Sequence, residues 1–142
     1  MANLFVKSLQ LHQQIYESTG GWLGHRMMMG MPSLLLRSVG RKTGETRTSA
    51  LIYGRDGEDY TVVASNGGAR RSPGWLHNVM SQPDCEIQIG RQRLPVTART
   101  VRPGDSDYAR MWARMNKINR GQYGQYQSKT NRPIAIVALR PR

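Results

Sequence analysis

Cysteine is nearly absent from this sequence of 142 residues, because Cys85 is the only one. A single cysteine excludes an internal disulfide and is typical of proteins in a reducing compartment. Cys85 lies in a strand-like run, so we expect a packed, unreactive thiol. Histidines are also few, and His12, His25 and His77 lack the spacing of metal ligands. The sequence therefore predicts neither a metal site nor a disulfide-stabilised fold.

Long hydrophobic runs are absent as well. No segment reaches 18 consecutive apolar residues, so no membrane-spanning helix is expected. The N-terminus lacks the continuous apolar region and cleavage site of a secretory signal, and we expect a cytoplasmic protein. Residues 1–20 show the amphipathic pattern of a helix. Packing of this helix on the domain is favoured over peripheral contact with the inner face of a membrane, because Lys7 is its only cation.

Acidic and aromatic residues are both scarce. The chain has 21 Lys and Arg against 9 Asp and Glu, which gives a formal net charge of +12, and its aromatic content is 7%. Excess positive charge favours nucleic acid, anionic lipid or a polyanionic small molecule as a partner, without choosing among them. The basic residues are spread along the chain, and together with the few aromatic residues this argues against a stacking surface for single-stranded nucleic acid.

The most informative stretch is a predicted hairpin, in which strands over residues 34–39 and 46–53 flank Gly40-Arg41-Lys42-Thr43-Gly44. Glycine at both ends lets the backbone turn tightly and approach a ligand closely. The two cations and the hydroxyl can form a nest of donors for an anion such as phosphate. The alternative is a solvated basic hairpin tip. A Walker loop is excluded, because the Gly-x-x-x-x-Gly-Lys-Thr spacing is missing.

A second basic cluster, Arg70 and Arg71, precedes a predicted short helix. Ser72 suits the N-cap of this helix, Pro73 suits its first position, and Pro83 marks its end. A helix N-terminus beside two arginines is a second candidate anion site.

The rest of the chain predicts strands over residues 60–65, 84–90, 94–101 and 133–139, with a turn cluster over residues 54–59. A further helix begins near Pro103 and ends at Gly121, and a polar segment over residues 122–129 follows it. About six short strands in hairpins indicate a mainly β fold. A small antiparallel barrel with flanking helices and a core over residues 34–139 is expected, because closure removes exposed edges.

Five segments, in order, resemble one known family. They are Gly-Arg-Lys-Thr-Gly at 40–44, Arg-Thr-Ser at 47–49, Ala-Ser-Asn-Gly-Gly-Ala at 64–69, Pro-Gly-Trp-Leu-His-Asn at 73–78 and Ala-Arg at 98–99. The sequence is similar to the deazaflavin-dependent nitroreductases, reductases that use coenzyme F420 and include quinone reductases. The match covers residues 34–139, and it implies a split-β-barrel domain spanning residues 1–142.

The resemblance also implies an activity, a hydride transfer from reduced F420 to a quinone, nitroaromatic or activated enone. It assigns the phosphate and acidic tail of F420 to Arg41, Lys42, Thr43, Arg47, Thr48 and Ser49. It assigns the ring and ribityl region to Val63, Ala64, Ser65, Asn66, Gly74, Trp75, Leu76, His77 and Asn78, with Tyr123 also beside the cofactor. On the substrate side, the candidate donors to an acceptor oxygen that gains charge are Tyr126 and Ser65.

Three residues depart from the family pattern. Asn66 stands where a lysine is often found, and Ile52 and Arg120 stand where well-studied members carry tyrosines. These changes leave the cofactor prediction intact but remove any inherited substrate preference. An FMN-dependent relative, a non-catalytic cofactor carrier and a nucleic-acid-binding module are the alternatives. Two separated basic clusters favour F420, because FMN needs only a small phosphate site. We therefore expect a small-molecule electron acceptor as partner, no nucleic acid, and a monomer or homodimer.

Overall fold

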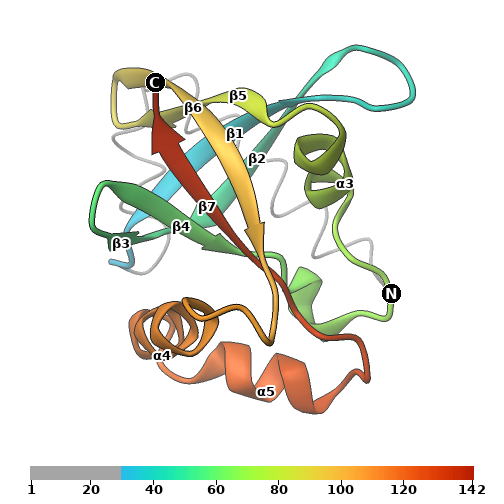
Figure 1. Ribbon diagram of the computed structural model, residues 1–142, viewed down its shortest axis with the longest axis vertical. Helices are drawn as coiled ribbons and strands as arrows, with labels where there is room; N and C mark the ends of the chain where they lie inside the picture. Colours follow the sequence, from blue (N-terminus) through green and yellow to red (C-terminus); the bar gives the residue numbers. More distant parts are fainter. Residues whose placement is uncertain (1–29) are drawn as a thin grey trace.

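A curled antiparallel sheet dominates the computed structural model, which describes residues 30–142 (Figure 1). Its strands are β1 (Ser33–Val39), β2 (Thr46–Ile52), β3 (Gly54–Asp56), β4 (Asp59–Val63), β5 (Asp84–Ile89), β6 (Gln92–Val101) and β7 (Ile136–Pro141). The helices in this range are the 3-10 helix η1 (Asn66–Gly68), α3 (Gly74–Ser81), α4 (Tyr108–Ile118) and α5 (Gln122–Ser128). The predicted N-terminal helix, residues 1–20, lies outside the described residues.

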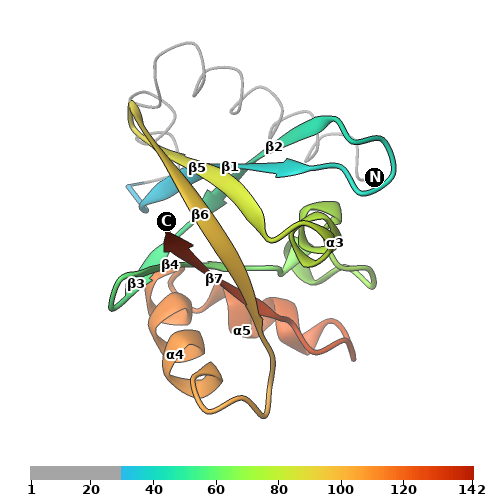
Figure 2. The same ribbon diagram turned by 45° about the horizontal axis from the view of Figure 1, so that its top comes forward.

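The strand order in the sheet is β2-β1-β5-β6-β7-β4-β3, and every neighbouring pair is antiparallel. The predicted hairpin is therefore one edge of the sheet, with Leu36 of β1 opposite Ser49 of β2 and Ile87 of β5. The rotated view in Figure 2 shows that the sheet curls strongly, like half of a barrel. These features confirm the mainly β, split-barrel-like fold.

β7 separates two hydrophobic clusters, because its side chains alternate between the two faces of the sheet. Val137 and Leu139 belong to the first cluster, and Ile136 and Ala138 to the second. The α3 cluster contains Leu34, Leu36, Val62, Ala64, Trp75, Leu76, Val79, Cys85, Ile87, Val96, Ala135, Val137 and Leu139. The α4–α5 cluster contains Val63, Val101, Met111, Met115, Tyr123, Ile134, Ile136 and Ala138. Burial on both faces explains why this strand is an unbroken apolar run in the sequence.

The two clusters are closed by different helices. α3 packs at one end of the curled sheet, whereas α4 and α5 lie together below β4 and β7 in Figure 1. The helix predicted between Pro103 and Gly121 contains α4, whose apolar face consists of the buried Met111 and Met115 with Tyr108 and Ile118 packed against the same cluster. None of the helices in residues 30–142 is long and apolar enough to span a bilayer.

Several predicted boundaries were wrong. The turn cluster over residues 54–59 contains β3, so the sheet has seven strands rather than about six; Gly57, at φ 60°, lets Asp56 and Asp59 pair across a tight turn. The last strand begins at Ile136 rather than at residue 133. Residues 122–129 are largely helical as α5, because Tyr123 packs into the α4–α5 cluster and stabilises a helix that the polar sequence does not indicate.

The start of α3 also differs from the prediction. Pro73 occupies the N-cap with an extended ψ of 149°, and Gly74 is the first helical residue. The fixed φ of proline suits both positions, and the extended ψ moves the helix start one residue downstream. Ser72 therefore precedes the helix and does not cap it.

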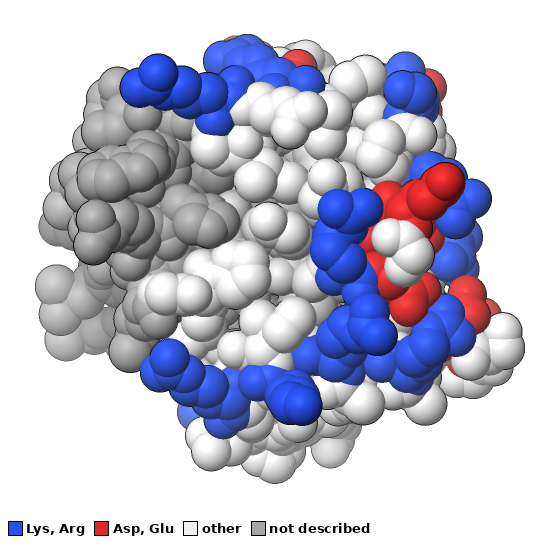
Figure 3. All heavy atoms as spheres, turned by 90° about the vertical axis from the view of Figure 1, so that its left-hand side faces the viewer, with Lys and Arg blue, Asp and Glu red and all other residues white. Residues whose placement is uncertain are grey.

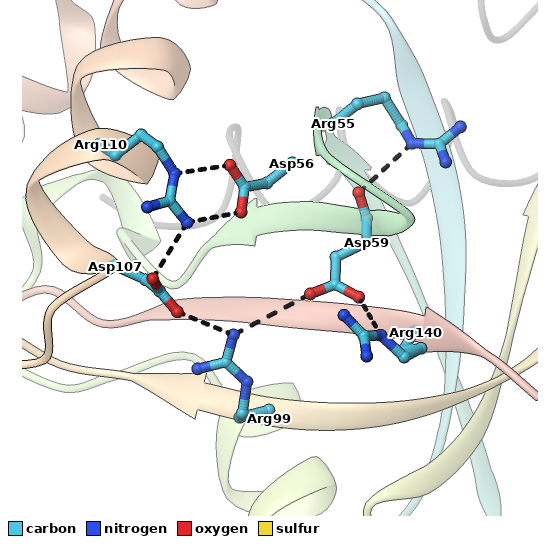
Figure 4. A network of polar contacts seen from close by, with 7 residues as sticks. All are labelled: Arg55, Asp56, Asp59, Arg99, Asp107, Arg110 and Arg140. Carbon is cyan, nitrogen blue, oxygen red and sulfur yellow. Dashed lines mark hydrogen bonds and ion pairs between the residues drawn. The ribbon is translucent and has the colours of Figure 1, made fainter.

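Ion pairs tie α4 to the sheet (Figure 4). Arg110 of α4 donates to both carboxylate oxygens of Asp56 at 2.9 Å and to Asp107 at 3.0 Å. Arg99 of β6 extends this network of ion pairs, because its guanidinium lies 3.4 Å from the Asp107 carboxylate and 3.9 Å from the Asp59 carboxylate. The hydrogen bond from Arg110 lowers the pKa of Asp56. The stability from this pair is therefore present above the unfolded pKa of Asp56 and is lost as the pH falls through its lowered folded value.

Candidate functional site

The turn between β1 and β2 presents the predicted phosphate-binding residues to solvent. The Gly40 amide donates to the Glu45 carbonyl at 2.7 Å, and the Gly44 amide donates to the Gly40 carbonyl at 2.8 Å. Gly44 adopts a φ of 74°, an angle that glycine reaches without strain. The glycine in the sequence therefore predicts the turn because the turn needs this backbone angle. The side chains of Arg41 and Lys42 are exposed and form no ion pair with any residue from 30 to 142. Their charges are thus available to an anion.

α3 holds this turn in place through one buried amide. The Asn78 side chain accepts a hydrogen bond from the Arg41 backbone amide at 3.2 Å and donates to the Ser38 hydroxyl at 3.2 Å. Asn78 is only 8% exposed. Figures 1 and 2 both show α3 beside the β1–β2 turn. Asn78 therefore braces the basic turn.

The loop after β4 has an unusual backbone. Asn66, Gly67 and Gly68 follow one another at φ 46°, 64° and 82°. Asn66 is one of two residues other than glycine with positive φ among residues 30–142. Its side-chain amide donates to the Arg71 carbonyl at 3.0 Å, which fixes the second basic cluster next to this loop. Strained backbone of this kind is concentrated at ligand sites in proteins.

α5 packs directly on the same loop. A Cβ atom at Gly68 would lie 2.7 Å from the Tyr126 carbonyl oxygen, so the two backbones touch. The half-buried Tyr126 donates its hydroxyl proton to Gln122 at 3.0 Å. Tyr123 is 5% exposed, its ring centroid lies 6.2 Å from that of Tyr126, and burial raises its pKa. Tyr126, the predicted substrate-side residue, thus contacts the predicted cofactor loop through its backbone, and Tyr123 lies beside it in the α4–α5 cluster.

The predicted site residues separate by burial. The exposed ones are Arg41, Lys42, Thr43, Arg47, Asn66, Gly74 and His77. The half-buried ones are Thr48, Ser49 and Tyr126, and the buried ones are Val63, Ala64, Ser65, Trp75, Leu76, Asn78 and Tyr123. Contacts join the turn to α3 and the 64–69 loop to α5. In Figure 1 the turn, α3 and the 64–69 loop lie along the right-hand flank of the molecule, and α5 lies below this flank.

The structure does not bring every predicted side chain together. Val63 belongs to the α4–α5 cluster and Ala64 to the α3 cluster, so these neighbours face opposite sides of the sheet. Trp75 and Leu76 are core residues, with exposed fractions of 7% and 2%. Arg47 pairs with Glu45 at 3.6 Å, which reduces the charge that it offers to a ligand. For the buried residues Val63, Ala64, Trp75 and Leu76, contact with a ligand is therefore limited to backbone and the edges of side chains.

One residue of this flank carried no sequence signal. The guanidinium group of Arg132, between α5 and β7, donates to the carbonyls of Ala64 at 3.1 Å and Ser65 at 2.9 Å and to that of Ala69 at 3.0 Å. These partners are more than 60 residues away in the sequence. A lone Arg-Pro pair before a strand does not indicate such a contact, and only the tertiary structure reveals it.

A separate hollow lies on the outer face of β6 and β7 and shares no residue with the predicted site. It has a volume of about 550 Å³ and is lined by Asp59, Thr97, Arg99, Ala138, Arg140, Pro141 and Arg142. Figure 3 shows acidic side chains enclosed by basic ones on this side of the molecule. Asp59 pairs with Arg140 at 2.8 Å and with Arg99 at 3.9 Å, so this one carboxylate offsets part of the positive charge of the three arginines in the lining.

Cys85 is not a candidate nucleophile. Its side chain packs in the α3 cluster, and burial raises the pKa of its thiol to about 11. Since the thiolate is the reactive form, Cys85 is unreactive at neutral pH, as the sequence predicts.

Comparisons with known proteins agree with this picture. Residues 8–141 match the family described as F420H(2)-dependent quinone reductase. The F420H(2)-dependent quinone reductase Rv1261c of Mycobacterium tuberculosis is 51% identical over 134 residues, which cover 94% of this chain and 90% of that protein. A solved F420-H2 dependent reductase, FDR-A, aligns with a TM-score of 0.68 and 30% identity, over 76% of this chain and 93% of that one.

The fold is shared more widely than the family. A pyridoxamine 5'-phosphate oxidase-like structure from Listeria innocua aligns with a TM-score of 0.55 at 13% identity, over 92% of this chain and 93% of that one. At this identity the likeness concerns the split-barrel fold alone. The family match, which spans most of the sequence, is the specific finding, and the chain belongs to the F420H(2)-dependent quinone reductases.

Proposed function

We propose that this protein reduces a quinone with F420H2, and that nitroaromatics and activated enones are further acceptors of the same site. The observation that carries this proposal is the exposed pair Arg41 and Lys42, which lies in a turn fixed by Asn78 on the same flank as the 64–69 loop. Bound F420H2 supplies the hydride, so the protein's own tasks are to bind, to orient and to exclude water.

The donors on this flank fit a polyanion. F420 carries a phosphodiester and a γ-linked glutamate tail, and the exposed cations of the turn are available to both groups. Because charge-assisted hydrogen bonds are stronger than neutral ones, Arg41 and Lys42 are the main binding residues in this proposal, and Thr43, Thr48 and Ser49 add hydroxyl donors. Arg47 contributes less, since Glu45 pairs with it.

The loop and α5 supply the other half of the proposed site. Ser65 and Asn66 present the loop backbone to the cofactor, while the edge of Trp75 and the exposed His77 and Gly74 bound it from α3. Tyr123 is buried and shields this region from water. Tyr126 is the proposed donor to the acceptor oxygen, with Ser65 as the second candidate. The Tyr126 hydroxyl now donates to the Gln122 side chain at 3.0 Å, and it can donate to a substrate once that side chain turns away.

Replacement of the turn cations tests cofactor binding. Arg41→Ala is expected to weaken F420 binding by about 1.5–3 kcal/mol, because one charge-assisted hydrogen bond is lost. The fold is expected to survive, since the side chain is exposed. The measurement is a fluorescence titration with F420, with FMN in parallel to detect the alternative flavin cofactor.

Arg91→Ala is the matched control for this titration. Arg91 is an exposed cation in the turn between β5 and β6 and forms no ion pair with a residue from 30 to 142. It should bind F420 like the wild type, which separates local contacts from the loss of net charge. An Arg41→Ala/Lys42→Ala double variant with wild-type affinity would contradict the proposed site.

Tyr126→Phe tests the substrate side. If the hydroxyl stabilises the developing oxyanion, its removal should lower kcat for a quinone by an amount equivalent to about 2.7–4 kcal/mol, with F420 affinity nearly unchanged. The measurement is steady-state turnover at saturating F420H2. Gln122→Ala, which removes only the partner of Tyr126, is the comparison and should retain most of the activity. Wild-type kcat and KM for several quinones and nitroaromatics would remove Tyr126 from the mechanism.

A further inference from the structure

Arg132 makes an unusual set of contacts. Its guanidinium donates to three backbone carbonyls, those of Ala64 at 3.1 Å, Ser65 at 2.9 Å and Ala69 at 3.0 and 3.3 Å. The planar fork of arginine can bind several acceptors at fixed angles, which a lysine ammonium does not reproduce. One half-buried side chain thereby joins both ends of the 64–69 loop.

The loop needs such a support. Asn66, Gly67 and Gly68 have positive φ in succession, and Asn66, the one residue of the three with a side chain, bears a backbone cost that the two glycines do not. The carbonyls of Ala64, Ser65 and Ala69 point toward one place, where without a cation their dipoles would repel one another. The Arg132 guanidinium therefore forms hydrogen bonds to these carbonyl oxygens of the protein itself.

Arg132 is itself held by α5. The side-chain amide of Gln127 donates to the Arg132 carbonyl at 2.8 Å and to the Thr130 carbonyl at 3.3 Å. Its oxygen accepts from the Ile134 amide at 3.0 Å, and the Arg132 amide donates to the Thr130 hydroxyl at 3.1 Å. The segment that carries Arg132 is therefore fixed to the helix that carries both site tyrosines.

We propose that Arg132 is a positioning residue, whose guanidinium fixes residues 64–69 in the conformation that receives F420. The inference rests on the proposed function, since it presupposes that this loop binds the cofactor. It assigns no direct contact between Arg132 and F420. The geometry of the fork, rather than the charge alone, does the work, so a lysine at this position should not replace it.

The test compares Arg132→Lys and Arg132→Ala with Arg142→Ala. Arg142 also donates to two backbone carbonyls, those of Val96 at 3.2 Å and Cys85 at 3.5 Å, but it lies in the separate hollow. In a fluorescence titration both Arg132 variants should raise the Kd for F420 about tenfold. Arg142→Ala should stay within about twofold of wild type. Arg132→Lys retains the charge, so a wild-type Kd in this variant overturns the inference.

Hydrogen exchange supplies a readout without cofactor. The amides of Gly68 and Ala69, which donate to the Ser65 and Asn66 carbonyls, should exchange faster in both Arg132 variants. Arg142→Ala should leave their exchange unchanged, and thermal midpoints identify any global unfolding. If Arg132→Ala does not fold, Arg132→Lys decides. Normal exchange in a folded Arg132→Lys overturns the inference. Wild-type protein that binds no F420 overturns both proposals, whereas tight binding by wild type and by Arg132→Lys leaves the proposed function standing.

Discussion

Trp75→Ala is expected to destabilise the folded protein by about 3–5 kcal/mol, the largest loss for any single change considered. The indole is 7% exposed and packs in the α3 cluster, where it closes one end of the curled sheet. Truncation removes its buried surface and leaves a cavity among Leu76 and Val79 of the same helix and the strands opposite. Denaturant unfolding monitored by circular dichroism measures the change.

A control on the same helix separates burial from helix propensity. Met80 is 49% exposed, so Met80→Ala should change stability by less than about 0.5 kcal/mol. F420 affinity, measured where Trp75→Ala is folded, should also fall, because α3 carries the brace of the basic turn. A large loss of stability with unchanged affinity would assign Trp75 to the core alone.

Gly68→Ala is the second change with a large expected effect. The new methyl group would lie 2.7 Å from the Tyr126 carbonyl oxygen and 3.1 Å from its Cα, and backbone atoms cannot turn away as a side chain can. Gly68 also has φ 82°, so the substitution adds backbone strain to the steric clash. Together these terms should cost about 3 kcal/mol or more. Thermal and denaturant unfolding provide the measurement.

Gly67→Ala is the matched control for that experiment. Gly67 has φ 64°, but a Cβ atom there meets nothing within 4 Å. Gly67→Ala should therefore lower the free energy of unfolding only by the cost of backbone strain, about 1–2 kcal/mol. Equal losses in the two variants would mean that the contact between the loop and α5 contributes nothing.

The sequence predicts the parts of this fold that have local signals. Alternating and continuous apolar runs indicate β1, β2, β5 and β6, and the spacing of Met111 and Met115 indicates α4. β3 is too short, at three residues, to show a period. α5 consists of polar residues and glycine with two tyrosines, and it is helical because those tyrosines pack in the α4–α5 cluster and its backbone contacts the loop. Tertiary packing therefore overrides a weak local preference there.

The candidate site divides in the same way. Glycines beside adjacent cations mark the basic turn and the 64–69 loop, since both require unusual backbone angles. The residues that hold these segments carry no such mark. Asn78 reaches the turn across 37 residues, and Arg132 reaches the loop across 67. Side chains that brace a site from afar depend on the three-dimensional fold, so a single sequence does not identify them.

The place of β7 in the sheet has a consequence for biosynthesis. Among residues 30–142, β7 is the only strand that pairs with both β4 and β6, and it is the last of the strands to be made. A nascent chain that has not yet exposed residues 136–141 outside the ribosome leaves β4 and β6 as two open edges, and both hydrophobic clusters lack their common wall. Open strand edges beside apolar surface are prone to aggregate. Chains in which β7 is not yet paired should therefore be more prone to aggregate than the folded protein.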